Sequence, residues 1–178
     1  MNEERLKKVP VLISACLLGV SCKYSGGDNC MNMELLEELK NHCQLVPVCP
    51  EQLGGLTTPR QPSEVCGSRV CMKNGTDVTL QYEKGACEAL YLAQLFGCRC
   101  AILKARSPSC GSGEIYDGTF SGTLISGDGK TAELLKKHGI RVYTEQEVMD
   151  RYKLTEPAEN GKIQKGFKEN DKDFDRRG

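Results

Sequence analysis

The chain has 178 residues, with 24 acidic and 24 basic side chains and 39% hydrophobic residues. This length is close to that of one domain, and the apolar fraction is sufficient for a buried core. The balanced and scattered charge argues against a protein that binds bulk nucleic acid, because such proteins concentrate basic residues on one surface. No segment reaches the roughly 18 consecutive apolar residues of a membrane-spanning helix.

Cysteine is the unusual residue in this composition. The chain contains 11 cysteines, an odd number without the regular pairing of a small secreted disulfide framework. We therefore expect a cytoplasmic protein. Lys7-Lys8 and the apolar run up to Cys16 imitate a lipoprotein signal, but Pro10 interrupts the run and Glu3-Glu4 places acid where such signals are basic.

The first third of the chain predicts a strand, a helix and a second strand. Residues 9–15 are apolar and rich in β-branched side chains, which is typical of a buried central strand. Asn32 then predicts the N-cap of a helix with leucines at helical spacing, and residues 45–48 predict the second strand. This order predicts a right-handed parallel crossover.

The middle third predicts a loop, a hairpin, a helix and a third strand. Residues 53–69 are rich in turn-forming residues and predict a long loop over the rim of the sheet. Asn74-Gly75 predicts the turn of a short hairpin over residues 69–80. An apolar helix over residues 84–96 and a third parallel strand over residues 101–105 follow.

The last third predicts a helix, a strand and a final helix. Asp128 predicts the start of a helix that ends at Gly139, residues 140–143 predict a fourth strand, and Thr144 predicts the cap of the last helix.

Alternation of strands and helices predicts an α/β fold, a three-layer, Rossmann-like single domain with a mostly parallel central sheet. We expect this domain over residues 1–154. Over residues 155–178 apolar residues become rare and charges alternate, which predicts a disordered tail because burial there cannot offset the entropy of ordering.

Three cysteines occupy equivalent positions, each after an apolar strand and at the start of a Gly/Pro turn. They are Cys16, Cys49 and Cys110. Because the carboxyl ends of parallel strands meet at one edge of a sheet, we expect the three sulfur atoms to converge. Three thiolates without a fourth turn-borne cysteine indicate an iron–sulfur or other metal site with one open position.

The remaining cysteines have simpler interpretations. Cys66 and Cys71 flank Gly67, but a lone C-x4-C pair is a weak zinc signal that needs ligands from elsewhere. Free cysteine usually behaves as a small buried apolar side chain. That interpretation applies to Cys43, Cys87, Cys98 and Cys100.

The residues around the three strand-end cysteines resemble the thiouracil desulfurases in their short single-domain form. The matching motifs are Ser14-Ala-Cys16-Leu-Leu-Gly19 with Lys23-Tyr24, Pro47-Val-Cys49-Pro-Glu51-x-Leu-Gly-Gly55 with Thr58-Pro-Arg60, and Lys104-x-x-Ser-Pro-Ser109-Cys110-Gly111. The match runs in order and spacing from about residue 10 to about residue 144, which makes it specific. The resemblance implies that Cys16, Cys49 and Cys110 hold a [4Fe-4S] cluster whose fourth iron has no protein ligand. The family pattern does not need Cys22, which we leave out of the cluster.

The resemblance also implies a reaction, the non-redox replacement of sulfur by oxygen in a thiolated pyrimidine, thiouracil to uracil, with release of sulfide. An iron with a vacant position is a thiophilic Lewis acid that polarises a C=S bond toward attack by water. Glu51, two residues after Cys49, is the candidate general base, and Ser109 the candidate hydrogen-bond partner of the pyrimidine or the departing sulfur. The family often places Asp-Gly after Tyr24, whereas here Asp28 supplies a loop carboxylate only from a shifted position.

Ordinary structural roles remain open for these polar residues. Glu51 could instead be an acidic residue in the first turn of a helix, where it interacts favourably with the helix dipole. Ser109 could be an ordinary turn residue. Arg60 could orient substrate or fix its loop. The glycine turn over residues 127–129, before a helix, could receive an anion such as a nucleotide phosphate.

Three other protein classes remain as alternatives. An iron–sulfur electron-transfer protein would use a fourth cysteine, a structural zinc module would form a closed site, and a thiol-redox protein would be expected to use a C-x-x-C pair, which none of the three cysteines forms. The sequence leaves open whether the small-molecule partner is a thiolated base, nucleoside or nucleotide, and it leaves the oligomeric state open.

Overall fold

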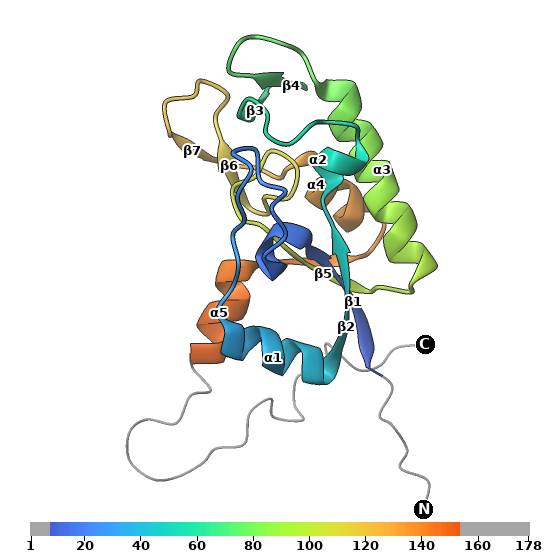
Figure 1. The fold of residues 1–178 in the computed structure, drawn as a ribbon. Helices are drawn as coiled ribbons and strands as arrows, with labels where there is room; N and C mark the ends of the chain where they lie inside the picture. Colours follow the sequence, from blue (N-terminus) through green and yellow to red (C-terminus); the bar gives the residue numbers. More distant parts are fainter. Residues whose placement is uncertain (1–7, 154–178) are drawn as a thin grey trace, which may run out of the picture.

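A four-stranded parallel sheet in the order β2-β1-β5-β8 forms the centre of the molecule (Figure 1). The computed structural model describes residues 8–153, so the tail predicted over residues 155–178 lies outside the described residues. The strands of the sheet are β1 (Val9–Ser14), β2 (Cys43–Val48), β5 (Cys100–Leu103) and β8 (Arg141–Thr144). All four strands predicted for the sheet are present, with their bounds shifted by one or two residues.

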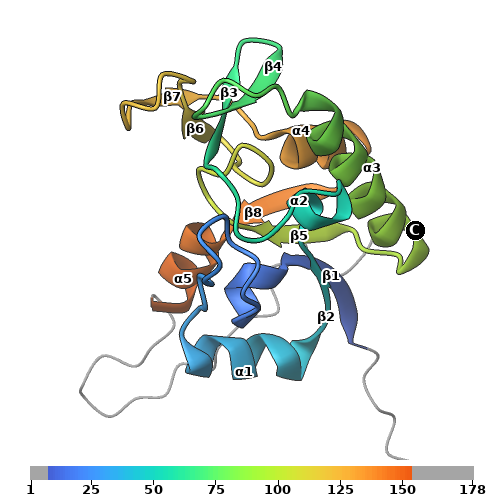
Figure 2. The ribbon, with the colours of Figure 1, turned by 45° about the horizontal axis from the view of Figure 1, so that its top comes forward.

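Helices cover both faces of this sheet (Figures 1 and 2). One face carries α1 (Met33–His42) and α5 (Glu145–Lys153), and the other carries α3 (Thr79–Leu95) and α4 (Lys130–Lys137). Successive side chains of β1 point to opposite faces: Leu12 packs in the cluster of α3 and α4, whereas Val11 and Ile13 pack in that of α1. The predicted three-layer, Rossmann-like architecture is confirmed.

Side-chain caps fix the starts of two helices as predicted. The Asn32 carboxamide accepts hydrogen bonds from two amides in the first turn of α1, at 2.7 and 3.3 Å. At the start of α5, the Thr144 hydroxyl accepts from the Glu147 amide while the Glu147 carboxylate accepts from the Thr144 amide. This reciprocal pair is a capping box, which places the first turn of α5 directly after β8.

The hairpin lies earlier in the chain than predicted. Strands β3 (Ser63–Cys66) and β4 (Arg69–Met72) pair around a two-residue turn at Gly67-Ser68. Gly67 has φ +66°, a conformation that suits glycine at the first position of a tight hairpin turn. Asn74-Gly75, which we expected to form the hairpin, makes the following turn instead, with the Gly75 amide bound to the Met72 carbonyl oxygen. The predicted loop over residues 53–69 therefore contains a strand.

Helix α3 begins at Thr79 and not at residue 84. The Asp77 carboxylate accepts hydrogen bonds from the amide and the hydroxyl of Thr79, which organises the turn before the helix. The apolar periodicity becomes clear only later in the segment, and the sequence prediction followed that periodicity.

Three of the four cysteines interpreted as buried apolar side chains are buried, and they are Cys43, Cys98 and Cys100. The interpretation was wrong for Cys87, which is exposed on α3. Helical spacing did not reveal which face Cys87 takes, because apolar residues surround it on both sides.

We expect one of these buried thiols to make stability depend on alkaline pH. Burial raises the pKa of Cys100 from 9.0 to about 11. The contribution of this thiol to the free energy of unfolding is therefore complete below pH 9 and declines as the pH rises toward 11. Between about pH 8 and pH 10.5, this group should lower the free energy of unfolding by about 2 kcal/mol, measured in guanidinium under reducing conditions. Cys100→Ala should remove that part of the decline, whereas the exposed-site variant Cys87→Ala should keep it. An unchanged pH slope in Cys100→Ala would contradict the assignment.

Candidate functional site

Cys16, Cys49 and Cys110 follow three neighbouring strands of the sheet. Cys16 lies in the short 3-10 helix η1 (Ala15–Leu18) after β1, Cys49 is the N-cap of α2 (Pro50–Leu53) after β2, and Cys110 ends the turn after β5. The chain changes its direction of winding between β1 and β5, and α/β sheets bind ligands outside their carboxyl edge at such a switch point.

The structure brings these three thiols together. Burial is the main cause that raises the pKa of Cys110, and the charges of Glu51, Cys16 and Cys49 raise it further. Burial and the Cys49 sulfur likewise raise the pKa of Cys16. The three thiols are thus near enough to influence one another, with Cys110 buried and Cys16 and Cys49 half-buried.

The Ser14 side chain joins the ends of β1 and β5 beneath this thiol site. Its hydroxyl accepts a hydrogen bond from the Lys104 amide at 3.0 Å and donates to the Cys110 sulfur at 3.4 Å. Ser14 is buried, as is Cys110. The hydrogen bond from Ser14 favours the thiolate form of Cys110 and so opposes part of the effect of burial.

A fourth thiol, that of Cys22, lies beside Cys49. Burial raises the pKa of Cys22 to about 12, with further contributions from Cys49 and Cys16. The Cys49 thiol also donates to the backbone oxygen of Cys22 at 3.8 Å. The sequence did not predict this contact, since Cys22 lies in a loop whose path depends on tertiary packing. Cys22 is therefore the fourth ligand that a closed cluster would use.

Three soft thiol donors near one another are a donor set that suits iron–sulfur chemistry. Among residues 8–153, no group of three or more His, Cys, Asp or Glu side chains is arranged to hold one metal ion. A structural zinc ion needs its ligands around one centre. The thiolates of a [4Fe-4S] cluster bind different iron atoms and do not share one centre.

The buried side chain of Arg60 and the half-buried Glu51 form an ion pair next to the thiols. Two nitrogens of Arg60, Nη2 and Nε, donate to Oε2 of Glu51 at 2.5 and 2.7 Å. The Arg60 side chain is only 3% exposed, and its other N–H groups bind Thr57 O, Thr58 Oγ1 and the Cys22 carbonyl. All five N–H groups are thus engaged, so Arg60 fixes the loop and has no donor left to orient a substrate.

The negative charge of Glu51 acts on two buried groups. It raises the pKa of the Cys110 thiol and that of the Tyr82 hydroxyl, although burial is the larger cause for both. Tyr82 projects from α3, and α2 packs closely on that helix. A Cβ at Gly85 would lie 1.9 Å from the Pro50 oxygen, so glycine is required for this approach. The contact holds the turn that carries Glu51.

Ser109 is buried, and its hydroxyl lies 2.8 Å from that of Thr131 on α4. The Thr131 amide also donates to the Ser109 carbonyl oxygen at 2.9 Å. Gly129 permits this contact because a Cβ there would lie 2.5 Å from the Ser109 backbone. The start of α4 thus positions the turn that carries Ser109 and Cys110.

The prediction of an anion site in the glycine turn before α4 was wrong. The amides of the three residues that open α4 bind the backbone oxygens of Pro108 and Ser109, which occupies them. Asp128 is not a side-chain cap either. Its carboxylate accepts from the Gly113 amide and pairs with Lys136, which places negative charge where an anion would bind.

The loop after Cys22 presents Asn29, not Asp28, to the thiols. Asp28 is exposed, and its carboxylate accepts the Cys30 amide at 2.9 Å, so a catalytic role for Asp28 stays a prediction. The Asn29 side chain hydrogen-bonds the Cys16 sulfur and lowers its pKa, as does the charge of Lys104. Sequence reasoning missed Asn29 because asparagine in a glycine-rich loop is ordinary turn material.

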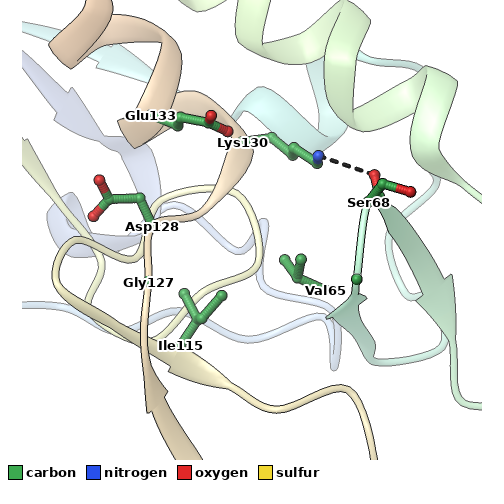
Figure 3. Close-up of a pocket in the computed structure, with 8 residues that line it drawn as sticks. Val65, Ser68, Ile115, Gly127, Asp128, Lys130 and Glu133 are labelled. Carbon is green, nitrogen blue, oxygen red and sulfur yellow. Dashed lines mark hydrogen bonds between the residues drawn. The ribbon is translucent and has the colours of Figure 1, made fainter.

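A cavity of about 460 Å³ lies between the hairpin, β6 (Glu114–Tyr116) and the start of α4 (Figure 3). The Lys130 ammonium donates to the Ser68 carbonyl oxygen at its margin. The lining residues are Val65, Gly67, Ser68, Ile115, Gly127, Asp128, Lys130 and Glu133. None of the three strand-end cysteines lines this cavity.

Comparison with known proteins agrees with the resemblance in the sequence. A family model described as 2-thiouracil desulfurase matches residues 11–147. The chain belongs to this family. A solved structure described as the [4Fe-4S]-dependent thiouracil desulfidase TudS is 43% identical and covers 80% of this chain and 95% of its own, with a TM-score of 0.77. The uncharacterized protein YbbK of Bacillus subtilis strain 168 is 42% identical over 150 residues, which are 79% of this chain and 98% of YbbK.

None of the helices within residues 8–153 is both long and apolar enough to span a bilayer.

Loss of the Arg60 guanidinium should destabilise the loop beside the thiols. Arg60→Met leaves the half-buried Glu51 carboxylate and the Cys22 carbonyl without their donors, and we expect the free energy of unfolding in urea to fall by about 3 kcal/mol. Arg60→Lys should recover only part of this, because one ammonium cannot reproduce the two N–H bonds to Glu51 Oε2 together with those to the backbone. Arg69→Met, at a loosely paired surface arginine, should change stability by less than about 0.5 kcal/mol. Equal stability of Arg60→Met and wild type would refute the structural role.

Proposed function

We propose that this protein is a [4Fe-4S]-dependent desulfurase that converts a thiolated pyrimidine, such as thiouracil, to the oxygen analogue. The observation that carries the proposal is the meeting of three thiols at the switch point of the sheet. Two findings support it: the chain belongs to the 2-thiouracil desulfurase family, and the similar solved structure is described as [4Fe-4S]-dependent.

Cys16, Cys49 and Cys110 are the residues that would hold the cluster. When bound, the cluster supplies a thiophilic iron that polarises the C=S bond of the substrate. The raised pKa values of Cys16 and Cys110 mean that these thiols carry protons without iron and lose them on metal binding. Asn29 and Lys104 favour the thiolate of Cys16, so the protein compensates part of that cost.

Glu51 is our candidate general base. Arg60 holds one carboxylate oxygen, Oε2, and we assign to the other, Oε1, the proton of the attacking water. The overall change is C=S plus water to C=O plus hydrogen sulfide, which requires no net electron transfer. Ser109 would hydrogen-bond the pyrimidine or the departing sulfur, with Thr131 fixing its hydroxyl.

A closed iron–sulfur site is the second candidate, because Cys22 lies beside Cys49. With Cys22 as the fourth ligand the cluster would have no open position, and electron transfer would be the expected function.

The two candidates differ in their response to two variants. We expect anaerobically reconstituted protein to remove the thiocarbonyl absorption of 2-thiouracil, with 4-thiouracil and a thionucleoside as parallel substrates. Cys110→Ala should lose both cluster and turnover, whereas Cys22→Ser should keep both. A loaded wild-type cluster that desulfurates none of the three substrates would exclude the proposed activity, and loss of the cluster in Cys22→Ser would favour the closed site.

Glu51→Gln should separate catalysis from cluster binding. The amide oxygen of the substituted side chain can still accept from Arg60, but the amide cannot take a proton, so we expect normal iron content and at least about a hundredfold lower kcat. Turnover of 2-thiouracil per cluster is the measurement. Glu37→Gln, at a surface carboxylate of α1, should keep normal turnover. Wild-type kcat in Glu51→Gln would assign the base to another residue.

A further inference from the structure

Helix α3 carries large apolar side chains on the side that faces solvent. Leu80, Tyr91 and Leu95 are 77%, 59% and 61% exposed. Cys87, between Leu80 and Tyr91, is exposed too. The spacings of seven, four and four residues place all four on one side of the helix. Single exposed apolar residues are ordinary, but several that adjoin on one surface indicate contact with another molecule.

The opposite side of α3 makes the contacts on which the fold depends. The helix packs against α2 and α4, and its inward residues are buried, among them Tyr82, Ala86, Ala89 and Ala93. Figures 1 and 2 show α3 at the margin of the molecule, with the sheet, α2 and α4 on one side of it only. A helix that only covers a sheet has a polar outer side, so apolar residues on both sides indicate a second contact.

The outer sides of α1 and α4 show the usual polar pattern. On α1 the Lys40 ammonium pairs with the Glu37 carboxylate at 2.7 Å, and on α4 the Lys137 ammonium pairs with the Glu133 carboxylate at 2.7 Å. All four side chains are exposed. Met33, at 63% exposure, is a single apolar residue at the start of α1. Compared with α1 and α4, helix α3 is therefore distinguished by a continuous exposed apolar side.

The exposed apolar residues of α3 are distributed about its midpoint. The helix runs from Thr79 to Leu95, so Cys87 is its middle residue. When two copies pack antiparallel about a two-fold axis near Cys87, the Leu80 end of each helix lies against the end of the other that carries Tyr91 and Leu95. This is the geometry of a symmetric dimer, in which residue i contacts residue j and residue j contacts residue i.

Two charges beside these apolar residues fit the same arrangement. Lys84 and Glu88 are exposed, and they lie one turn apart on the same flank of the helix, one before and one after the midpoint. In an antiparallel pair the equivalent flanks adjoin, so the two-fold axis places Lys84 of one copy beside Glu88 of the other, and the reverse. Both contacts join opposite charges. The chain therefore supplies its own complementary surface, which favours a second copy as the occupant.

We propose that two copies of this chain associate through their α3 helices as an antiparallel, two-fold dimer. The residues of this interface, which we call the outer face of α3, are Leu80, Lys84, Cys87, Glu88, Tyr91 and Leu95. Contact through one helix of 17 residues from each copy, about 25 Å long, is at the small end of specific interfaces, so we expect dimerisation to depend on concentration. None of these residues belongs to the thiol site, so the dimer depends on neither the cluster nor the desulfuration.

Sedimentation equilibrium of the cluster-loaded full chain, under anaerobic and reducing conditions, tests the proposal. We expect the average mass to rise with concentration from 19.6 kDa toward twice that value. Tyr91→Glu should raise the dissociation constant at least about tenfold, because it places a charge within the apolar part of the interface. Met33→Glu, at the exposed apolar residue of α1, is the matched control and should leave the constant unchanged. Circular dichroism should show wild-type helix content in both variants.

Exchange of the two charges tests the antiparallel arrangement. Lys84→Glu would place like charges at both of the symmetric contacts, so we expect the dissociation constant to rise at least about fivefold. Lys84→Glu combined with Glu88→Lys re-forms both contacts with reversed signs and should restore the wild-type constant. A double variant that dimerises as weakly as Lys84→Glu would show that the two helices do not pair in this way.

Cross-linking tests the position of the axis. With a short bismaleimide, wild-type protein should give a covalent dimer, and so should Cys30→Ser, which lacks the other exposed cysteine. Cys87→Ser should give none, although it still dimerises in sedimentation. The proposal is overturned if the mass stays at 19.6 kDa up to about 0.5 mM protein, if Met33→Glu weakens the dimer as much as Tyr91→Glu, or if Cys87→Ser still cross-links.

Discussion

The two hydrogen bonds of the Ser14 hydroxyl hold together the edge on which the candidate site depends. They connect the end of β1 to the Lys104 amide after β5 and to the Cys110 sulfur. Cys16 lies two residues after Ser14, so one buried side chain sets the spacing of two strand-end thiols. Packing of α2 on α3 through Gly85 brings in Cys49 and Glu51 from the third strand end. Sheet topology alone brings these segments near one another, and these contacts determine their alignment.

The site contains charged and ionisable side chains whose removal from water would destabilise the protein if they had no partners. The Glu51 carboxylate is acceptable there because Arg60 pairs with it, and Arg60 in turn has a partner for every N–H group. In the proposed desulfurase, metal binding would replace the protons of the thiols whose pKa burial raises, Cys16 and Cys110. Neighbouring Asn29, Ser14 and Lys104 favour the thiolate forms. The surroundings are thus arranged for a group that binds thiolates.

Much of the fold was predictable because its signals are local. The apolar strand runs and the caps at Asn32 and Thr144 depend on near neighbours, and the parallel order then follows from general rules of chain connection. The hairpin was misplaced because Asn74-Gly75 is a stronger local turn signal than Gly67-Ser68, while pairing with the strand from Ser63 decides the outcome. The contacts of Cys22, Asn29 and Arg60 were missed or left open since they arise where loops distant in sequence meet. The periodicity of apolar residues in the sequence carries no information about such contacts.

An anaerobic crystal structure of the reconstituted protein, with anomalous scattering recorded at the iron edge, tests the central claim most directly. The account predicts four iron peaks at the carboxyl edge of the sheet, with sulfur bonds from Cys16, Cys49 and Cys110 to three of them. The fourth iron should have no protein ligand and should face the side of the site that carries Glu51. A bond from Cys22 to that iron, or a single metal ion shared by the three cysteines, would contradict the account.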